Sequence, residues 1–154
     1  MGKPAKIVCI VLIGVLVLTQ FFQPERNKGT IDPTLDLLGI TSIPDSLAAI
    51  LRNSCYYCHS DHTDYPWYSK ISPVSWFLEK HIEDGKEKLN MSKFGELEKS
   101  RKIGVLADIC DVIETGSMPL KSYLVIHGHA RVNEQEREAI CVWSELEALS
   151  LMRE

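Results

Sequence analysis

The residues best suited to carry out chemistry are Cys55, Cys58 and His59, which form a Cys-x-x-Cys-His sequence. Two thiols at this spacing lie close enough to add to both vinyl groups of one porphyrin, and the imidazole beside them can reach the iron from the same side. Cys-x-x-Cys-His is the sequence of covalent c-type haem attachment. It therefore predicts one covalently bound haem c per chain, with His59 as the proximal iron ligand.

Two other classes of site use paired cysteines. A zinc site needs four ligands. Cys110 or Cys141 could join the ligands near the pair, but the sequence has no second Cys-x-x-Cys and no His-x₃-His. A thiol–disulfide oxidoreductase carries its pair at a helix N-terminus after a strand, whereas this pair follows a helical pattern. A haem-free module that holds zinc, or a disulfide between Cys55 and Cys58, stays the alternative.

The sixth iron position is usually filled in haem proteins that carry electrons, and a His/Met pair raises the reduction potential. Met118 is the predicted distal ligand because it lies in a loop after a helix stop, where Pro119 stiffens the backbone. His81, on the apolar face of a predicted helix, is the alternative distal ligand. An open sixth site would instead favour a haem-based sensor or a peroxidase-associated module.

Aromatic residues follow the attachment sequence closely. Trp67, Tyr68 and Trp76 are predicted to line the haem pocket, because a haem is large, flat and apolar and amphipathic rings suit such walls. His127 and His129 share a polar loop, from which they could contact a haem propionate.

The body is predicted to be all-α, because no segment alternates with a period of two and four segments carry helical patterns. The first helix has Pro44 near its first turn and runs directly into the attachment sequence. The second opens with Ser72 as N-cap and Pro73 at the first helical position, and Gly85 falls near its end. The third stops at Gly116.

The fourth helix begins at Asn133, with Glu136 three residues later in a capping-box arrangement. Each helix carries an apolar stripe that is predicted to face the core. The stripes are Leu47, Ile50 and Leu51; Val74, Phe77, Leu78, His81 and Ile82; Ile103, Leu106, Cys110 and Ile113; and Ala139, Val142, Leu146 and Leu149, broadened by Ile140 and Trp143. Cys110 and Cys141 are expected to be buried thiols, and their spacing neither requires nor excludes a bridge.

The N-terminal segment places Lys3 and Lys6 before an apolar run from Ile7 to Leu18. This order is typical of signal anchors and of signal peptides. We expect residues 1–24 to form an uncleaved transmembrane anchor, with a cleaved signal peptide as the alternative and the body on the periplasmic side of the cytoplasmic membrane. Residues 25–42 are polar and interrupted by proline and glycine, so we expect a linker before a domain over residues 43–154.

The charge of the chain bears on its partners. The formal net charge over 154 residues is −4, and the N-terminal segment is basic, so the body is acidic. Nucleic-acid binding needs a basic surface, so no nucleic-acid partner is expected. An acidic surface suits a basic redox protein. The five cysteines are too few and too irregular for a scaffold built on disulfides.

Several stretches together resemble the small haem-binding domain family of bacterial membrane-anchored proteins. They are Asn53 to Ser60, Pro66 to Ser69, Ile71 to Trp76 and Gly116 to Pro119, with His81, Gly85, Leu89, Asn90, Tyr123 and His127 between or after them. The resemblance covers Leu47 to Trp143. It implies a cytochrome c-like fold and haem binding, without implying a defined reaction.

Together these features predict an all-α, cytochrome c-like domain around one haem, preceded by an N-terminal transmembrane helix. The predicted function is one-electron transfer through the iron, with a redox protein as partner. We do not expect an enzyme, because no acid–base pair is placed to work over an open iron.

Overall fold

The computed structural model describes residues 2–153, and every regular element in that range is a helix. In chain order the elements are α1 (Lys3–Thr19), α2 (Leu37–Ile40), α3 (Asp45–Ser54), α4 (Tyr56–His59), η1 (Trp67–Lys70), α5 (Val74–Lys88), η2 (Met91–Glu96), α6 (Lys99–Glu114), α7 (Lys121–Leu124), η3 (Gly128–Ala130) and α8 (Glu134–Arg153). Within the described range there is no strand, and Lys28 and His62 form an isolated antiparallel β-bridge. The predicted all-α fold is confirmed.

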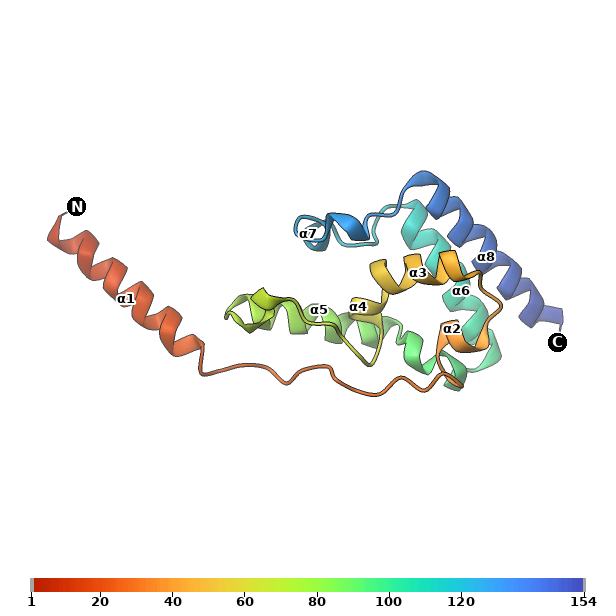
Figure 1. Ribbon diagram of the computed structural model, residues 1–154, viewed down its shortest axis with the longest axis horizontal. Helices are drawn as coiled ribbons and strands as arrows, with labels where there is room; N and C mark the ends of the chain where they lie inside the picture. Colours follow the sequence, from red (N-terminus) through yellow and green to blue (C-terminus); the bar gives the residue numbers. More distant parts are fainter. Residues whose placement is uncertain (1, 154) are drawn as a thin grey trace.

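Helix α1 stands apart from the body (Figure 1), and none of its residues is buried. It has 17 residues, including Lys3 and Lys6, whereas a transmembrane helix needs about 20 mostly apolar residues. Across residues 2–153, no helix combines the length and the apolar character that crossing a membrane requires. The single-pass anchor predicted for residues 1–24, and with it the predicted place of the body at the cytoplasmic membrane, is therefore wrong.

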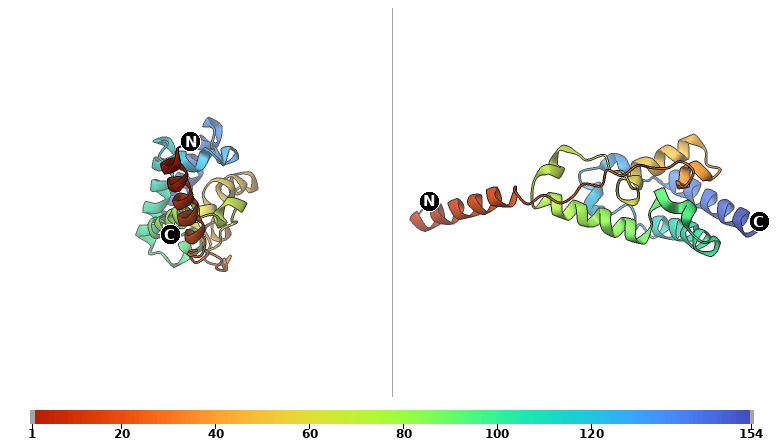
Figure 2. Two further views of the ribbon diagram at one scale, coloured as in Figure 1. Left: turned by 90° about the vertical axis from the view of Figure 1, so that its left-hand side faces the viewer. Right: turned by 90° about the horizontal axis from the view of Figure 1, so that it is seen from below.

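The chain between α1 and α2 runs in extended form along the body to its far end (Figures 1 and 2). The Asn27 amide donates to the Ser60 carbonyl at 2.8 Å and to the Thr63 hydroxyl at 2.9 Å. Leu37 is fully buried in the core. Residues 25–42, predicted to be a linker, are thus held against the body by hydrogen bonds and by apolar packing.

The core lies where α3, α6 and α8 meet. Leu51 of α3 and Leu106 of α6 are fully buried, which confirms the faces predicted for these two helices. Helices α6 and α8 lie side by side (Figure 1). Burial of such apolar side chains contributes about 1.5–3 kcal/mol each relative to exposure, so this three-helix contact fixes the position of the α3 C-terminus.

Helix α8 buries only part of the face predicted for it. Ile140 and Trp143, predicted to broaden that face, are buried together with Cys141, Ser144 and Ala148, whereas the predicted central stripe is exposed: Ala139, Val142, Leu146 and Leu149. Apolar residues occur on more than one side of this helix, so periodicity alone offered two candidate faces. The start of the helix is as predicted, because the Asn133 and Glu136 side chains each accept the other's backbone N–H, at 3.0 and 2.8 Å.

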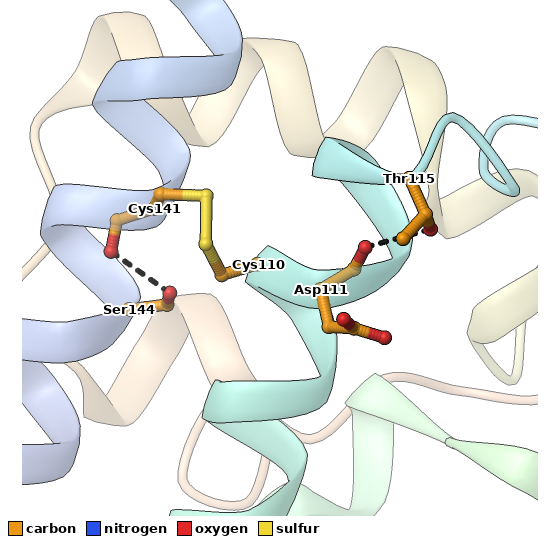
Figure 3. Close-up of a disulfide and its surroundings, with 5 residues drawn as sticks. All are labelled: Cys110, Asp111, Thr115, Cys141 and Ser144. Atoms are coloured by element: carbon orange, nitrogen blue, oxygen red, sulfur yellow. Dashed lines mark hydrogen bonds between the residues drawn. A yellow bond between two sulfur atoms is a disulfide. The ribbon is translucent and has the colours of Figure 1, made fainter.

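A disulfide joins α6 to α8 through Cys110 and Cys141 (Figure 3), whose Cα atoms lie 4.7 Å apart. The expectation of two buried thiols is therefore wrong. Ser144, one turn further along α8, donates from its hydroxyl to the Cys141 carbonyl at 3.0 Å. The bridge sets which side of α8 faces α6, and this explains why the buried face differs from the predicted stripe.

Helix α5 begins after Pro73, which is its N-cap, one residue beyond the predicted cap. It continues through Gly85, where the sequence placed its end, to Lys88. Val74 and Phe77, predicted to face the core, are 39% and 58% exposed. Helix α5 therefore packs through a narrower face, and that face lies against the attachment sequence.

Candidate cofactor site

The attachment sequence forms one helical turn directly after α3. Cys55 ends α3 and begins α4, and its carbonyl accepts the backbone N–H of Cys58 at 3.2 Å and of His59 at 3.0 Å. Residues three and four apart share one side of a helix, so this turn places Cys55, Cys58 and His59 together. Both cysteines are free thiols.

His59 is held by a backbone partner rather than by a side chain. Its Nδ1 lies 3.0 Å from the carbonyl oxygen of Leu89, just beyond the end of α5. A carbonyl can only accept, so Nδ1 carries the proton and Nε2 presents its lone pair. Burial lowers the pKa of His59, which keeps the imidazole neutral. Metal-binding histidines usually have such an outer partner, because it fixes the tautomer and the ring orientation.

Gly85 lets α5 approach the attachment turn closely. A Cβ atom built at this position would lie 2.9 Å from the Cys58 carbonyl oxygen and 3.2 Å from the Cys58 Cβ. Both are atoms on or next to the backbone, which cannot move aside as the end of a long side chain can. The absence of a side chain at Gly85 therefore brings the Leu89 carbonyl within reach of His59.

Both thiols have raised pKa values in the folded chain, so they stay protonated at neutral pH. Burial, followed by the neighbouring Cys58, raises the pKa of Cys55 to about 12. Burial raises the pKa of Cys58 to about 11. Thiol–disulfide oxidoreductases depend on a cysteine whose pKa is lowered, so this electrostatic environment argues against that class of site.

A cleft opens beside the attachment turn, in two adjoining parts. The larger part, of about 540 Å³, is lined by Cys55, His59 and Met118 among mostly apolar residues. The smaller part, of about 230 Å³, is lined by the same three residues together with Cys58 and His81. Cofactor pockets usually occupy about 300–1,000 Å³ and are mostly apolar, so the cleft has the size and polarity of such a pocket.

The two candidates for distal ligand lie on different parts of this cleft. Met118 comes from the loop between α6 and α7, where its N–H donates to the Val112 carbonyl at 3.0 Å, and it lines both parts of the cleft. His81 lines only the smaller part, and its Nδ1 lies 2.7 Å from the Phe77 carbonyl oxygen of its own helix. The geometry favours Met118, because it shares the whole cleft with His59.

The aromatic residues predicted as pocket walls do not line this cleft. Trp67 is 78% exposed, and Trp76 is 40% exposed with its Nε1 donating to the Phe22 carbonyl at 2.5 Å. Tyr68 forms a hydrogen bond with His127 instead. Tyr68 nevertheless lies near the attachment sequence, where burial, followed by the charge of Cys58, raises the pKa of Tyr68.

His127 and His129 belong to a neighbouring cavity of about 610 Å³. Burial, followed by the charge of His129, lowers the pKa of His127. Tyr57 and Tyr123 line both this cavity and the smaller part of the cleft, so these two rings separate the two spaces. Neither histidine reaches the cleft, which leaves the expected propionate contact without support.

A zinc site at the attachment turn would lack ligands. Cys110 and Cys141, which could have completed it, are joined in the disulfide. Among residues 2–153, the group of three potential ligand atoms close enough to hold an ion is Cys110, Glu114 and Cys141, away from the turn. The donor set at the turn is two thiols and one imidazole, which fits a covalently attached haem better than a four-ligand zinc site.

Three contributors to the site gave no signal in the sequence. The Leu89 carbonyl is a backbone group, so residue type could not reveal it. Lys88 and Arg101 line the larger part of the cleft, but each reads in the sequence as an ordinary charged residue on a helix. The Gly85 position could have been found, because a glycine inside a helical pattern often marks close packing.

A family model described as "Haem-binding domain" matches residues 14–145. No curated protein and no solved structure matches the chain.

Proposed function

The chain belongs to the haem-binding domain family and binds haem, and we propose that it holds one haem c covalently and works as a one-electron carrier. In this proposal Cys55 and Cys58 carry the thioether bonds, His59 is the proximal ligand and Met118 the distal ligand. The observation that supports it best is the 3.0 Å contact between His59 Nδ1 and the Leu89 carbonyl. It leaves Nε2 to bind a metal beside two thiols.

The attachment uses the thiols of the turn and needs no oxidant. Each S–H would add across one vinyl group of the haem, so that a sulfur–carbon bond forms and the hydrogen passes to the neighbouring vinyl carbon. Cys55, the N-cap of α4, lies three residues before Cys58, and its carbonyl accepts the Cys58 N–H at 3.2 Å. This turn keeps both sulfur atoms on the side of the chain that His59 occupies.

The bound iron supplies a couple between ferrous and ferric states, and a His/Met pair raises its reduction potential. In this proposal the chain supplies the two ligands and an apolar wall beside them. Val105, Ile109 and Val112 of α6 line the larger part of the cleft. Such apolar walls control solvent access and dielectric, and through them the reduction potential.

Covalent attachment is tested by producing the full chain in a host that matures c-type cytochromes. After acid–acetone extraction, we expect a pyridine haemochrome spectrum of the c type to stay with the protein. The Cys55→Ala/Cys58→Ala variant should lose it, whereas Cys9→Ala, which removes an exposed free thiol on α1, should keep it. A haem that the solvent extracts from the wild-type chain would overturn the covalent proposal.

The distal ligand is tested with a matched pair of substitutions in the same cleft. Met91 lines the larger part of the cleft, as Met118 does, so Met91→Leu is the control for Met118→Leu. We expect a low-spin ferric spectrum and slow carbon monoxide binding in the wild type and in Met91→Leu, and a high-spin spectrum with fast binding in Met118→Leu. A high-spin wild type would mean an open sixth site, and a change only in His81→Ala would make His81 the ligand.

A further inference from the structure

Three charged side chains line the larger part of the cleft. Lys88 is the last residue of α5, and Arg101 and Asp108 lie on α6. Lys88 and Arg101 are exposed residues, so their charged ends meet solvent where the cleft opens. The other residues that line this part of the cleft are mostly apolar. An anionic ligand bound here would therefore find its positive partners in Lys88 and Arg101.

Arg101 and Lys88 are tied to the proximal side of the site. The Arg101 guanidinium donates through Nη2 to the Lys88 carbonyl at 3.3 Å. The next residue, Leu89, supplies the carbonyl that holds His59. The Arg101 guanidinium therefore lies beside the backbone of Lys88, next to the residue that positions the proposed iron ligand.

The residues that line each part distinguish the two ends of the cleft. Cys58 lines only the smaller part, Cys55 and Lys88 line both parts, and Arg101 lines only the larger part. A haem attached through its vinyl groups has two propionates at the opposite edge of the ring. In a haem bound this way, those carboxylates would lie away from Cys58, toward the end of the cleft that Arg101 lines.

We propose that Arg101 and Lys88 bind the haem propionates at the mouth of the cleft. Pairs of a guanidinium or ammonium with a carboxylate are among the stronger hydrogen bonds in proteins, and arginine can bind a carboxylate through two parallel N–H groups. This inference rests on the proposed covalent haem. It gives these two residues a positioning role, because they fix the ring edge opposite the thioether bonds.

The consequence for the iron follows from charge. Cations beside the propionates neutralise negative charge near the ring, which favours the ferrous state over the more positive ferric state. Removing one cation should therefore raise the ratio of ferric to ferrous iron at a fixed potential by about threefold. A tenfold change corresponds to about 59 mV for a one-electron couple, so threefold lowers the midpoint potential by about 28 mV.

The test uses the full haem-loaded chain with Arg101→Gln, Lys88→Gln, Arg101→Lys and a control, Lys99→Gln. Lys99 is an exposed cation in the first turn of α6 that lines neither part of the cleft. Covalent haem is measured first in every sample by pyridine haemochrome. The midpoint potential and the propionate bending modes in resonance Raman spectra are then compared.

We expect Arg101→Gln and Lys88→Gln to lower the potential and shift the propionate modes, while Arg101→Lys stays near wild type and Lys99→Gln changes neither. Values for Arg101→Gln and Lys88→Gln that match those of Lys99→Gln would overturn the inference and leave the proposed function standing. A wild-type chain without covalent haem would overturn the proposed function, and this inference with it.

Discussion

Replacing Gly85 by alanine tests the close contact between α5 and the attachment turn. A Cβ at this position would lie 2.9 Å from the Cys58 carbonyl oxygen, and overpacking of this kind costs about 1–3 kcal/mol. Alanine in a helix interior is favoured over glycine by about 1 kcal/mol, which offsets part of that cost. The matched control is Gly104→Ala, also inside a helix, where a Cβ would meet nothing within 4 Å.

The helix-propensity gain is common to both variants, so it cancels in their difference. We expect Gly85→Ala to have a free energy of unfolding about 1–3 kcal/mol lower than that of Gly104→Ala. Urea unfolding followed by circular dichroism measures this difference. Equal stabilisation of the chain by both substitutions would refute the argument that a glycine is needed for α5 to reach the attachment turn.

Three further predictions concern stability. Replacing Cys110 and Cys141 together by serine should lower the free energy of unfolding by about 3–4 kcal/mol, because the disulfide restricts the unfolded chain by closing a loop with sequence separation 31. A loss below about 1 kcal/mol in urea unfolding would contradict this prediction. Burial raises the pKa of Asp36 above its ordinary value of 3.8, against the hydrogen bond from Tyr56. Because the folded pKa is raised, the stability that this group contributes is complete below pH 3.8 and is lost as the pH rises through the folded pKa. Asp36→Asn should therefore gain stability relative to wild type as the pH rises through that range. A difference in unfolding free energy that does not change with pH would count against this prediction. Asn133→Ala should lower the melting temperature through the loss of about 1 kcal/mol of capping free energy, whereas Asn133→Asp should not.

The sequence was sufficient for the all-α class, for the ends of two helices and for the attachment turn, but not for the end of α5 or for the buried face of α8. Caps and stops are local signals, so the reciprocal hydrogen bonds of Asn133 and Glu136 and the positive φ of Gly116 match the predicted ends of two helices. The Cys55 to His59 turn is local as well. Its chemistry depends on spacing within one helical turn, which the order of residues fixes before any packing occurs.

The rest of the site depends on contacts between distant segments, which residue type does not report. The Leu89 carbonyl reaches His59 only because Gly85 lets α5 approach. The aromatic residues near the attachment sequence were predicted from chain proximity, but Trp67 points to solvent. The anchor prediction gave weight to basic residues before an apolar run, and the short length of α1 overturns it.

The central claim, one haem held by two thioether bonds, is tested most directly by the intact mass of the full chain after denaturation in acid and organic solvent. We predict the polypeptide mass plus one haem, and after proteolysis a haem-bearing peptide that contains both Cys55 and Cys58. A mass equal to that of the polypeptide alone, or haem carried on a peptide that contains Cys9 instead, would contradict it.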